Sequence, residues 1–148
     1  MTISRDRMQA VVLEHVEAEN VEAENCNDPA RVVATYSRIM PVFEDVPSGA
    51  RYVGGDEIVG NYRHLWDGFP ALAREITRWT FGEDSVVIEL TLRGRHEGVF
   101  RGAPATNNEM TLRVIAHFEF DDEGRIQQET AYYDSLAVVR ALRAQAAT

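Results

Sequence analysis

The hydrophobic residues of this chain change their spacing near the middle, and that change limits the fold more than any other feature. In the first half apolar side chains recur three or four positions apart, as in Ile58, Tyr62 and Trp66. Beyond Glu75 they alternate with polar ones, most regularly over residues 112–118. The first spacing fits one face of a helix and the second fits one face of a strand. Helices followed by strands predict an α+β domain, with helices packed on one face of an antiparallel sheet.

The same patterns place the elements. Helices are expected over residues 5–24, 28–39 and 56–72, and a short closing helix over 135–143. Asp28 before Pro29 suits an N-cap followed by proline at the first helical position. The stretch 41–54, which holds prolines and glycines, is expected to be mostly loop, with 52–53 as a candidate short strand. One domain over residues 1–148 suits a chain of this length.

A five-residue repeat lies within the first predicted helix: the sequence VEAEN at 16–20 recurs unchanged at 21–25. Five residues turn a helix by about 500°, so the second copy points roughly 140° away from the first. Two interpretations stay open, namely coincidence among common helix formers and a tandem duplication, natural or engineered, that lengthens this helix.

Composition excludes several classes of function. The net charge is −9, and the 15 basic residues, all Arg, are scattered among 24 acidic ones, which argues against nucleic-acid binding. The absence of Lys excludes Schiff-base chemistry and a P-loop lysine. Cys26 is the single cysteine, which excludes an internal disulfide and a thiolate zinc site. His15 and Glu19 are too few to bind a metal, so a hydrogen bond on the helix surface is expected, with no metal and no cofactor.

No apolar run approaches the roughly 18 residues of a membrane-spanning helix, and the N-terminus lacks a signal-peptide pattern. No membrane partner is therefore expected, and the single cysteine favours the reducing cytoplasm.

The last predicted hairpin carries a polar face. A turn at 121–124 sets its register and places Arg113 opposite Tyr132. The face then presents side chains that suit a ligand pocket: Arg113, His117, Tyr132 and Asp134. Arg113 lies one diagonal step from Asp134 and is its expected ion-pair partner. Two alternatives stay open, because Asp134 also suits the N-cap of the closing helix and His117 also suits a structural role.

Several short stretches from His15 to Leu142 occur in a family order: His15 with the following Ala-Glu-Asn, Phe69-Pro70, residues 94–98, residues 102–106, and residues 124–126 through Tyr133-Asp134. Together they resemble the SnoaL-like polyketide cyclases of the nuclear transport factor 2-like superfamily. The resemblance implies a cone, in which a curved antiparallel sheet wraps around N-terminal helices and encloses a deep apolar pocket. It also implies a homodimer. Because the family pattern has one Ala-Glu-Asn unit, the resemblance favours the duplication.

The resemblance implies a carboxylate at the end of the last strand as general acid/base, and Asp134 matches that position. Arg113 and His96 would then stabilise charge on a carbonyl oxygen. Further candidates for contact with the substrate are Tyr36, Tyr52, Trp66, Phe100, His117 and Tyr132. A buried Asp134 would favour catalysis, whereas an exposed Asp134 that caps the last helix would favour a binding or structural role.

The resulting hypothesis is a cofactor-independent cyclase, lyase or isomerase that acts on a polyketide-like or other hydrophobic carbonyl compound. The alternatives are a non-catalytic small-molecule-binding or dimerisation module of the same fold, and an epoxide hydrolase or dehydratase.

Overall fold

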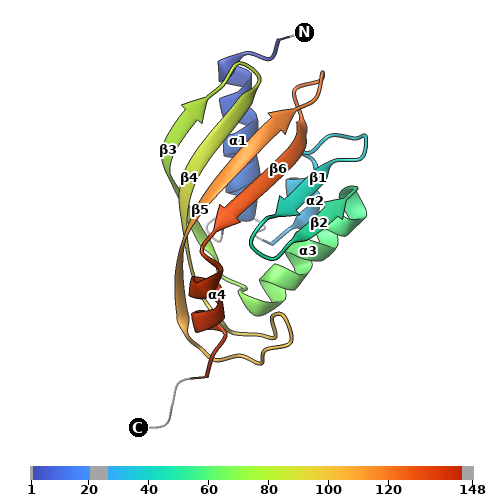
Figure 1. Cartoon of the computed structure of the whole chain (residues 1–148). Helices are drawn as coiled ribbons and strands as arrows, with labels where there is room; N and C mark the ends of the chain where they lie inside the picture. Colours follow the sequence, from blue (N-terminus) through green and yellow to red (C-terminus); the bar gives the residue numbers. More distant parts are fainter. Residues whose placement is uncertain (1, 21–26, 145–148) are drawn as a thin grey trace.

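The computed structural model describes residues 2–20 and 27–144, which form a curved six-stranded sheet with helices on one face (Figure 1). The elements in chain order are α1 (Arg5–Glu19), α2 (Pro29–Val33), β1 (Val42–Asp45), β2 (Ala50–Val53), α3 (Gly55–Gly68), β3 (Ala73–Phe81), β4 (Ser85–Arg95), β5 (Glu109–Phe120), β6 (Ile126–Tyr133) and α4 (Ser135–Ala141). The strand order across the sheet is β2-β1-β6-β5-β4-β3. The predicted α+β class is confirmed. Within the described ranges no helix is long and apolar enough to cross a membrane.

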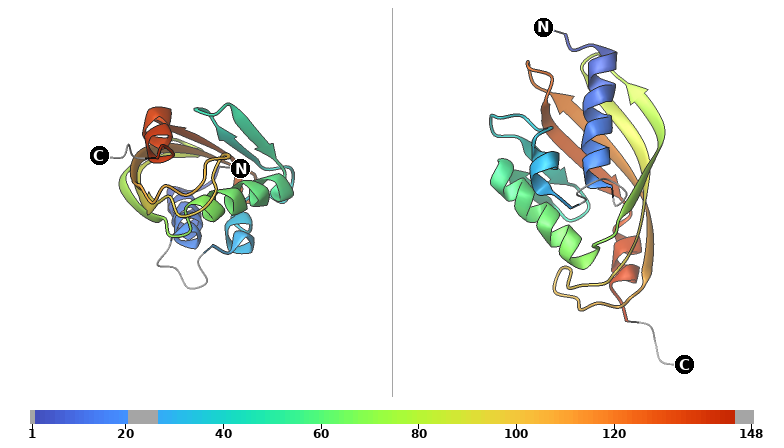
Figure 2. Two further views of the ribbon diagram at one scale, coloured as in Figure 1. Left: turned by 90° about the horizontal axis from the view of Figure 1, so that it is seen from below. Right: turned by 180° about the vertical axis from the view of Figure 1, so that it is seen from behind.

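The core lies between the helices and the concave face of the sheet, which curls around α1 and α3 (Figure 2). Alternation along the strands produces this core, because every second side chain of β4 and β5 points to the same face. Leu112, Val114, Ala116 and Phe118 of β5 are all buried, as their spacing predicts.

All four described helices end earlier than their patterns predict, α4 by only two residues. Helix α1 ends at Glu19, because Asn20 has an extended backbone. The second VEAEN copy, residues 21–25, lies outside the described residues, so the duplication stays a hypothesis. Helix α2 ends at Val33, because the chain that follows pairs with the start of β6 through a bridge from Tyr36 to Ile126. Helix α3 ends at Gly68, whose carbonyl accepts backbone N–H groups from the β4–β5 connection.

The segment predicted to be mostly loop forms the hairpin of β1 and β2, which adds one parallel strand pair to the predicted antiparallel sheet. Strand β1 pairs antiparallel with β2 and parallel with β6. The turn between β1 and β2 is short because Ser48 donates its backbone N–H to Asp45 and Gly49 takes a positive φ of 74°. In the parallel pair Phe43 lies beside Glu129 and Asp45 beside Ala131.

The predicted register of the last hairpin is wrong by two residues. Phe120 lies opposite Ile126 instead of Arg125, and Gln127 forms a bulge. Asp121 explains why Arg125 does not pair with Phe120, which is the first residue of the shift. Its Oδ1 accepts the backbone N–H of Arg125 at 2.9 Å and holds that residue in the turn.

A shift of two residues leaves the side chains on their predicted faces. His117, now opposite Thr130, still shares a face with Arg113 and Tyr132. That face is the convex one, directed away from the helices, and the Tyr132 side chain there is 47% exposed. The concave face is taken by Val114, Ala116 and Phe118, whose burial stabilises the fold.

Candidate functional site

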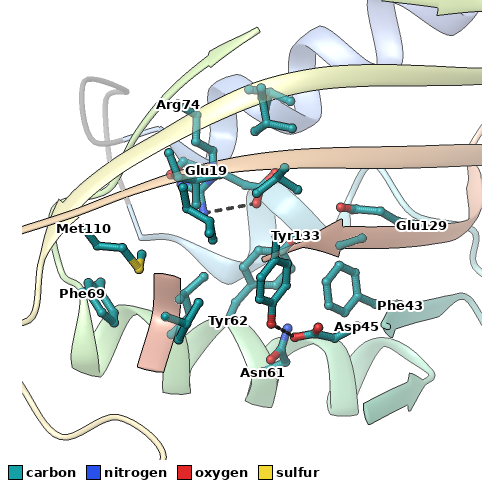
Figure 3. Close-up of a pocket in the computed structure, with 18 of the residues that line it drawn as sticks. Glu19, Phe43, Asp45, Asn61, Tyr62, Phe69, Arg74, Met110, Glu129 and Tyr133 are labelled. Carbon is teal, nitrogen blue, oxygen red and sulfur yellow. Dashed lines mark hydrogen bonds and ion pairs between the residues drawn. The ribbon is translucent and has the colours of Figure 1, made fainter. Parts of the chain in front are cut away.

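A cavity of about 130 Å³ lies between the concave face of the sheet and helices α1 and α3 (Figure 3). Most of its wall is apolar and comes from alternate residues of two strands: Ile88, Leu90 and Leu92 of β4, and Leu112, Val114 and Phe118 of β5. Two groups of polar side chains also border it, and they come from different elements.

The first group, here the Asp45 cluster, consists of Asp45 of β1, Arg101 of the β4–β5 connection and Tyr133 of β6. The Tyr133 hydroxyl donates to Asp45 Oδ2 at 2.7 Å. Arg101 Nη2 lies 3.1 Å from the Tyr133 oxygen and 3.4 Å from Asp45 Oδ2. Burial, with a further contribution from Asp45, raises the pKa of Tyr133 to about 12, so this hydroxyl keeps its proton and donates it. Asn61 of α3 lies beside Asp45 in Figure 3.

Arg101 reaches the cavity because the β4–β5 connection is fixed on α3. Its backbone takes a left-handed φ of 49° and donates its N–H to His64 Nε2 at 3.2 Å. The neighbouring Phe100 stacks on the His64 ring, with 4.8 Å between ring centroids. A positive φ is costly outside glycine, so these contacts must hold the residue in place.

The second group, here the His15 cluster, consists of His15, Glu19, Tyr36, Tyr62, Arg74 and Glu129. His15 is fully buried, and its Nε2 lies 2.8 Å from Glu19 Oε1 and 3.0 Å from Glu129 Oε1. Glu19 and Glu129 border the cavity from α1 and β6, and both contact the same ring nitrogen of His15.

Both ring nitrogens of His15 act as donors. The Thr35 hydroxyl donates to the Val32 carbonyl at 2.7 Å, so its oxygen accepts the proton of His15 Nδ1 at 2.8 Å. Nε2 faces two carboxylates, which accept hydrogen bonds when ionised. Burial by itself opposes the charged imidazolium, but Glu19 and Glu129 outweigh it and raise the pKa of His15 to about 10.

The other residues of the His15 cluster provide charge and hydrogen-bond partners for its two carboxylates. Burial opposes ionisation of Glu19, but His15 and Arg74 outweigh it and lower the pKa of this carboxyl. Arg74 Nη2 lies 3.5 Å from Glu19 Oε2. The Tyr36 hydroxyl donates to Glu129 Oε1 at 2.7 Å. The His15 cluster therefore balances two carboxylates with one imidazolium and one guanidinium.

The three residues predicted to be catalytic lie outside the cavity wall. Asp134 is exposed and caps α4, accepting the Leu136 backbone N–H at 2.9 Å, as the capping alternative predicts. Arg113 pairs with Glu89 at 3.4 Å instead of with Asp134. His96 is buried and stacks on Phe69. Their catalytic roles stay a prediction.

The predicted substrate-contacting residues are divided. Phe100 borders the cavity. Tyr36 belongs to the His15 cluster behind the wall, and His117 and Tyr132 lie on the convex face. Tyr52 and Trp66 do not belong to the cavity wall formed by the described residues. Sequence reasoning missed Asp45, Arg101, Glu129 and Tyr133. The alternation along β6 was the one available signal for Glu129 and Tyr133, and none pointed to Asp45 or Arg101.

The spacing of His15 and Glu19 predicted a contact, and the contact is present. Its setting differs from the prediction, because both residues are buried instead of lying on the helix surface. Among the residues that the structure describes, no group of three His, Cys, Asp or Glu side chains could hold a metal ion. Nε2 of His15 instead serves as a donor to both neighbouring carboxylates.

The open, curved sheet encloses a cavity together with the helices, which is the architecture of small pocket-forming domains. Comparison with known proteins identifies the family. The family model for SnoaL-like polyketide cyclases matches residues 14–142. The chain therefore belongs to the SnoaL-like polyketide cyclase family. Comparison with curated proteins finds no match.

Solved structures share the fold. A provisionally named SnoaL-like polyketide cyclase from Jannaschia sp. CCS1 is 22% identical, with a TM-score of 0.80 and coverage of 99% of both chains. A provisionally named hydroxylase from Streptomyces galilaeus is 21% identical, with a TM-score of 0.77 and coverage of 94% of this chain and 82% of the other. A phenazine biosynthesis-related protein from Pseudomonas aeruginosa is 16% identical, with a TM-score of 0.77 and coverage of 97% and 90%. At these identities the likeness shows the fold alone.

Proposed function

We propose that the cavity binds a small hydrophobic carbonyl compound and that Asp45 moves a proton at the carbon next to the carbonyl, in a reaction of cyclase, lyase or isomerase type. The Asp45 carboxylate is the main support for this proposal. It borders an apolar cavity, its side chain is 12% exposed, and Tyr133 holds it in one orientation. Restricted access of water favours acid/base chemistry by a carboxylate.

Arg101 and Asn61 supply the second requirement, which is a donor for the carbonyl oxygen. When Asp45 takes the proton, the C–H electrons form the enolate double bond and charge moves to the oxygen. That oxygen lies two bonds from the carbon that loses the proton, so its donors must lie beside the base. Arg101 Nη2 is 3.4 Å from Asp45 Oδ2, and a guanidinium stabilises the developing charge. Where a C=C bond of the substrate is conjugated with the enolate, the charge also reaches the far carbon of that bond, and return of the proton there gives the isomer.

Proton exchange in D₂O tests the proposal. A panel of ketones is incubated with the protein, and loss of the signal of the proton next to the carbonyl is followed by NMR. Asp45→Asn is expected to lower the exchange rate by roughly 100-fold or more. The matched control is Asp134→Asn, which removes the carboxylate that the sequence predicts to be catalytic. Loss of exchange in Asp134→Asn with full activity in Asp45→Asn would assign the proton transfer to Asp134.

A non-catalytic binding role is the second candidate. The pairing of Asp45 with Arg101 and Tyr133 favours it, because this carboxylate already has hydrogen-bond partners without a substrate. Binding of a ketone without any exchange in the wild-type protein would establish this role.

The proposed assembly is a homodimer formed through the convex face of the sheet, where Ile115 and Tyr132 are exposed. Sedimentation equilibrium measures the mass in solution, and a monomer at high concentration would contradict the dimer.

A further inference from the structure

The cavity is small compared with the fused-ring compounds that the family name suggests. Its volume is about 130 Å³. A buried apolar cavity of about 150 Å³ in another protein holds one benzene molecule. A fused system of three or four rings needs several times that space. The cavity therefore has room for one ring.

Well-packed elements fix this size. The walls are strand side chains of β4 and β5, whose backbones are paired on both sides within the sheet. The His15 cluster also borders the cavity, and its charges and hydrogen bonds are mutually satisfied. In the Asp45 cluster, Arg101 and Tyr133 converge on one carboxylate. Close-packed interiors resist expansion, so a larger ligand would have to displace these groups.

Charge limits the ligand further. Glu19 and Glu129 are balanced by His15 and Arg74, and Asp45 is balanced by Arg101. An ionic ligand would enter a site without an unpaired opposite charge and would lose its hydration, which is costly. A neutral ligand does not meet this cost.

We infer that the substrate is a neutral compound with one ring, or an open chain of equal size, whose ring fills the apolar part of the cavity and whose oxygen faces the Asp45 cluster. The carbonyl in this description rests on the proposed function, whereas the size and the neutrality rest on the cavity itself.

A matched series of methyl ketones tests the size. Acetophenone, 2-acetylnaphthalene and 2-acetylanthracene carry the same acetyl group on one, two and three rings, and calorimetry gives each Kd. Acetophenone is expected to bind, the two-ring ketone to bind at least about tenfold more weakly, and the three-ring ketone to show no binding. Binding of the three-ring ketone as tight as that of acetophenone, or no binding of acetophenone, would overturn the inference.

Two variants place the binding in this cavity. Ala131 forms part of the wall, and Ala131→Leu fills the space, so acetophenone binding is expected to weaken at least about tenfold. Leu112→Ala removes volume from the same wall and is expected to admit the two-ring ketone. Ile115→Ala on the convex face is the control and should change neither Kd. Unchanged binding in both wall variants would overturn the inference.

Isosteric probes test the charge. Acetophenone is neutral, benzoate is an anion and benzamidinium is a cation of nearly the same shape. The neutral compound is expected to bind at least about tenfold more tightly than either ion, and tighter binding of an ion would overturn the neutrality.

The two proposals fail in different ways. If acetophenone binds in the cavity without proton exchange, the proposed function fails and the size inference stands. If 2-acetylanthracene binds and exchanges its protons in an Asp45-dependent way, the size inference fails and the proposed function stands.

Discussion

The Asp45 cluster and the His15 cluster border the same cavity but differ in how water reaches them. The His15 side chain is completely buried and the carboxylates of Glu19 and Glu129 nearly so. In the Asp45 cluster the Arg101 side chain is 37% exposed, and it belongs to a loop instead of a helix or strand. Water can therefore replace a lost partner in the Asp45 cluster far more easily than in the His15 cluster.

This difference in exposure suggests that the two clusters have different roles. A buried pair that loses one partner leaves an unbalanced charge in a medium of low polarity, so it must remain intact for the fold to persist. The Asp45 carboxylate is paired with a cation that is partly exposed, Arg101, so it can change partners when a ligand enters. We therefore expect changes in the His15 cluster to act on stability and changes in the Asp45 cluster to act on binding and turnover.

The strongest test removes the central cation of the His15 cluster. His15→Ala leaves the carboxylates of Glu19 and Glu129 facing a void, and the free energy of unfolding is expected to fall by about 3–5 kcal/mol. Urea unfolding at pH 7 measures it. Asp45→Asn is the matched change in the other cluster and should cost about 1 kcal/mol. Equal losses in the two variants would remove the distinction between the clusters.

The pH dependence of stability tests the same cation without removing it. The pKa of His15 is raised from 6.5 to about 10, so the folded state holds a proton that the unfolded state releases. Its contribution is complete below pH 6.5 and is lost as the pH rises toward 10. The charged and titratable groups that face His15 are the other members of the His15 cluster. The pKa of Glu19 is lowered from its ordinary value and so lies below this window, and burial keeps the hydroxyl pKa values of Tyr36 and Tyr62 above it.

The free energy of unfolding of the wild-type protein is therefore expected to fall by roughly 2–4 kcal/mol between pH 6.5 and about pH 9.5. His15→Gln lacks the titrating group and should show a much flatter profile over the same range. Parallel profiles for the two proteins would mean that His15 is neutral when folded.

Local patterns predicted the regular parts of the fold because their cause is local. The alternation over residues 112–118 follows from the pleat of one strand, and the structure buries the predicted side. The hairpin register failed because a side chain, Asp121, and a bulge at Gln127 changed the turn by two residues.

The candidate site was less predictable, because its geometry depends on pairs of residues distant in sequence. Asp45 lies in a segment expected to be loop, and it reaches the cavity through parallel pairing of β1 with β6. Glu129 contacts His15 from the other end of the chain. Helical spacing indicated a contact between His15 and Glu19 but gave no information on what would cover them.

Two tyrosine variants compare how much one hydroxyl hydrogen bond contributes to stability in each cluster. Tyr36→Phe removes a buried hydrogen bond to Glu129, and the expected loss of unfolding free energy is about 1.5–3 kcal/mol. Tyr133→Phe removes a bond of the same length to Asp45, where water can take its place, and should cost less than about 1 kcal/mol. Thermal or urea unfolding measures both, and a larger loss for Tyr133→Phe would reverse the comparison.

Asp134 is a carboxylate that belongs to neither cluster, so its variants show the effect on stability and binding of losing a carboxylate outside the cavity. Its Oδ1 accepts the Leu136 backbone N–H at the start of α4, and loss of such a cap costs about 1 kcal/mol. Asp134→Ala is therefore expected to lower the free energy of unfolding by that amount and to leave acetophenone binding unchanged, whereas Asp134→Asn should restore most of the stability because Asn also caps helices well. Weaker binding in both variants at normal stability would instead place Asp134 in the site, as the position of this residue at the end of the last strand predicts. Because the cap lies outside the cavity, the two measurements separate a residue that holds a helix from one that contacts a ligand.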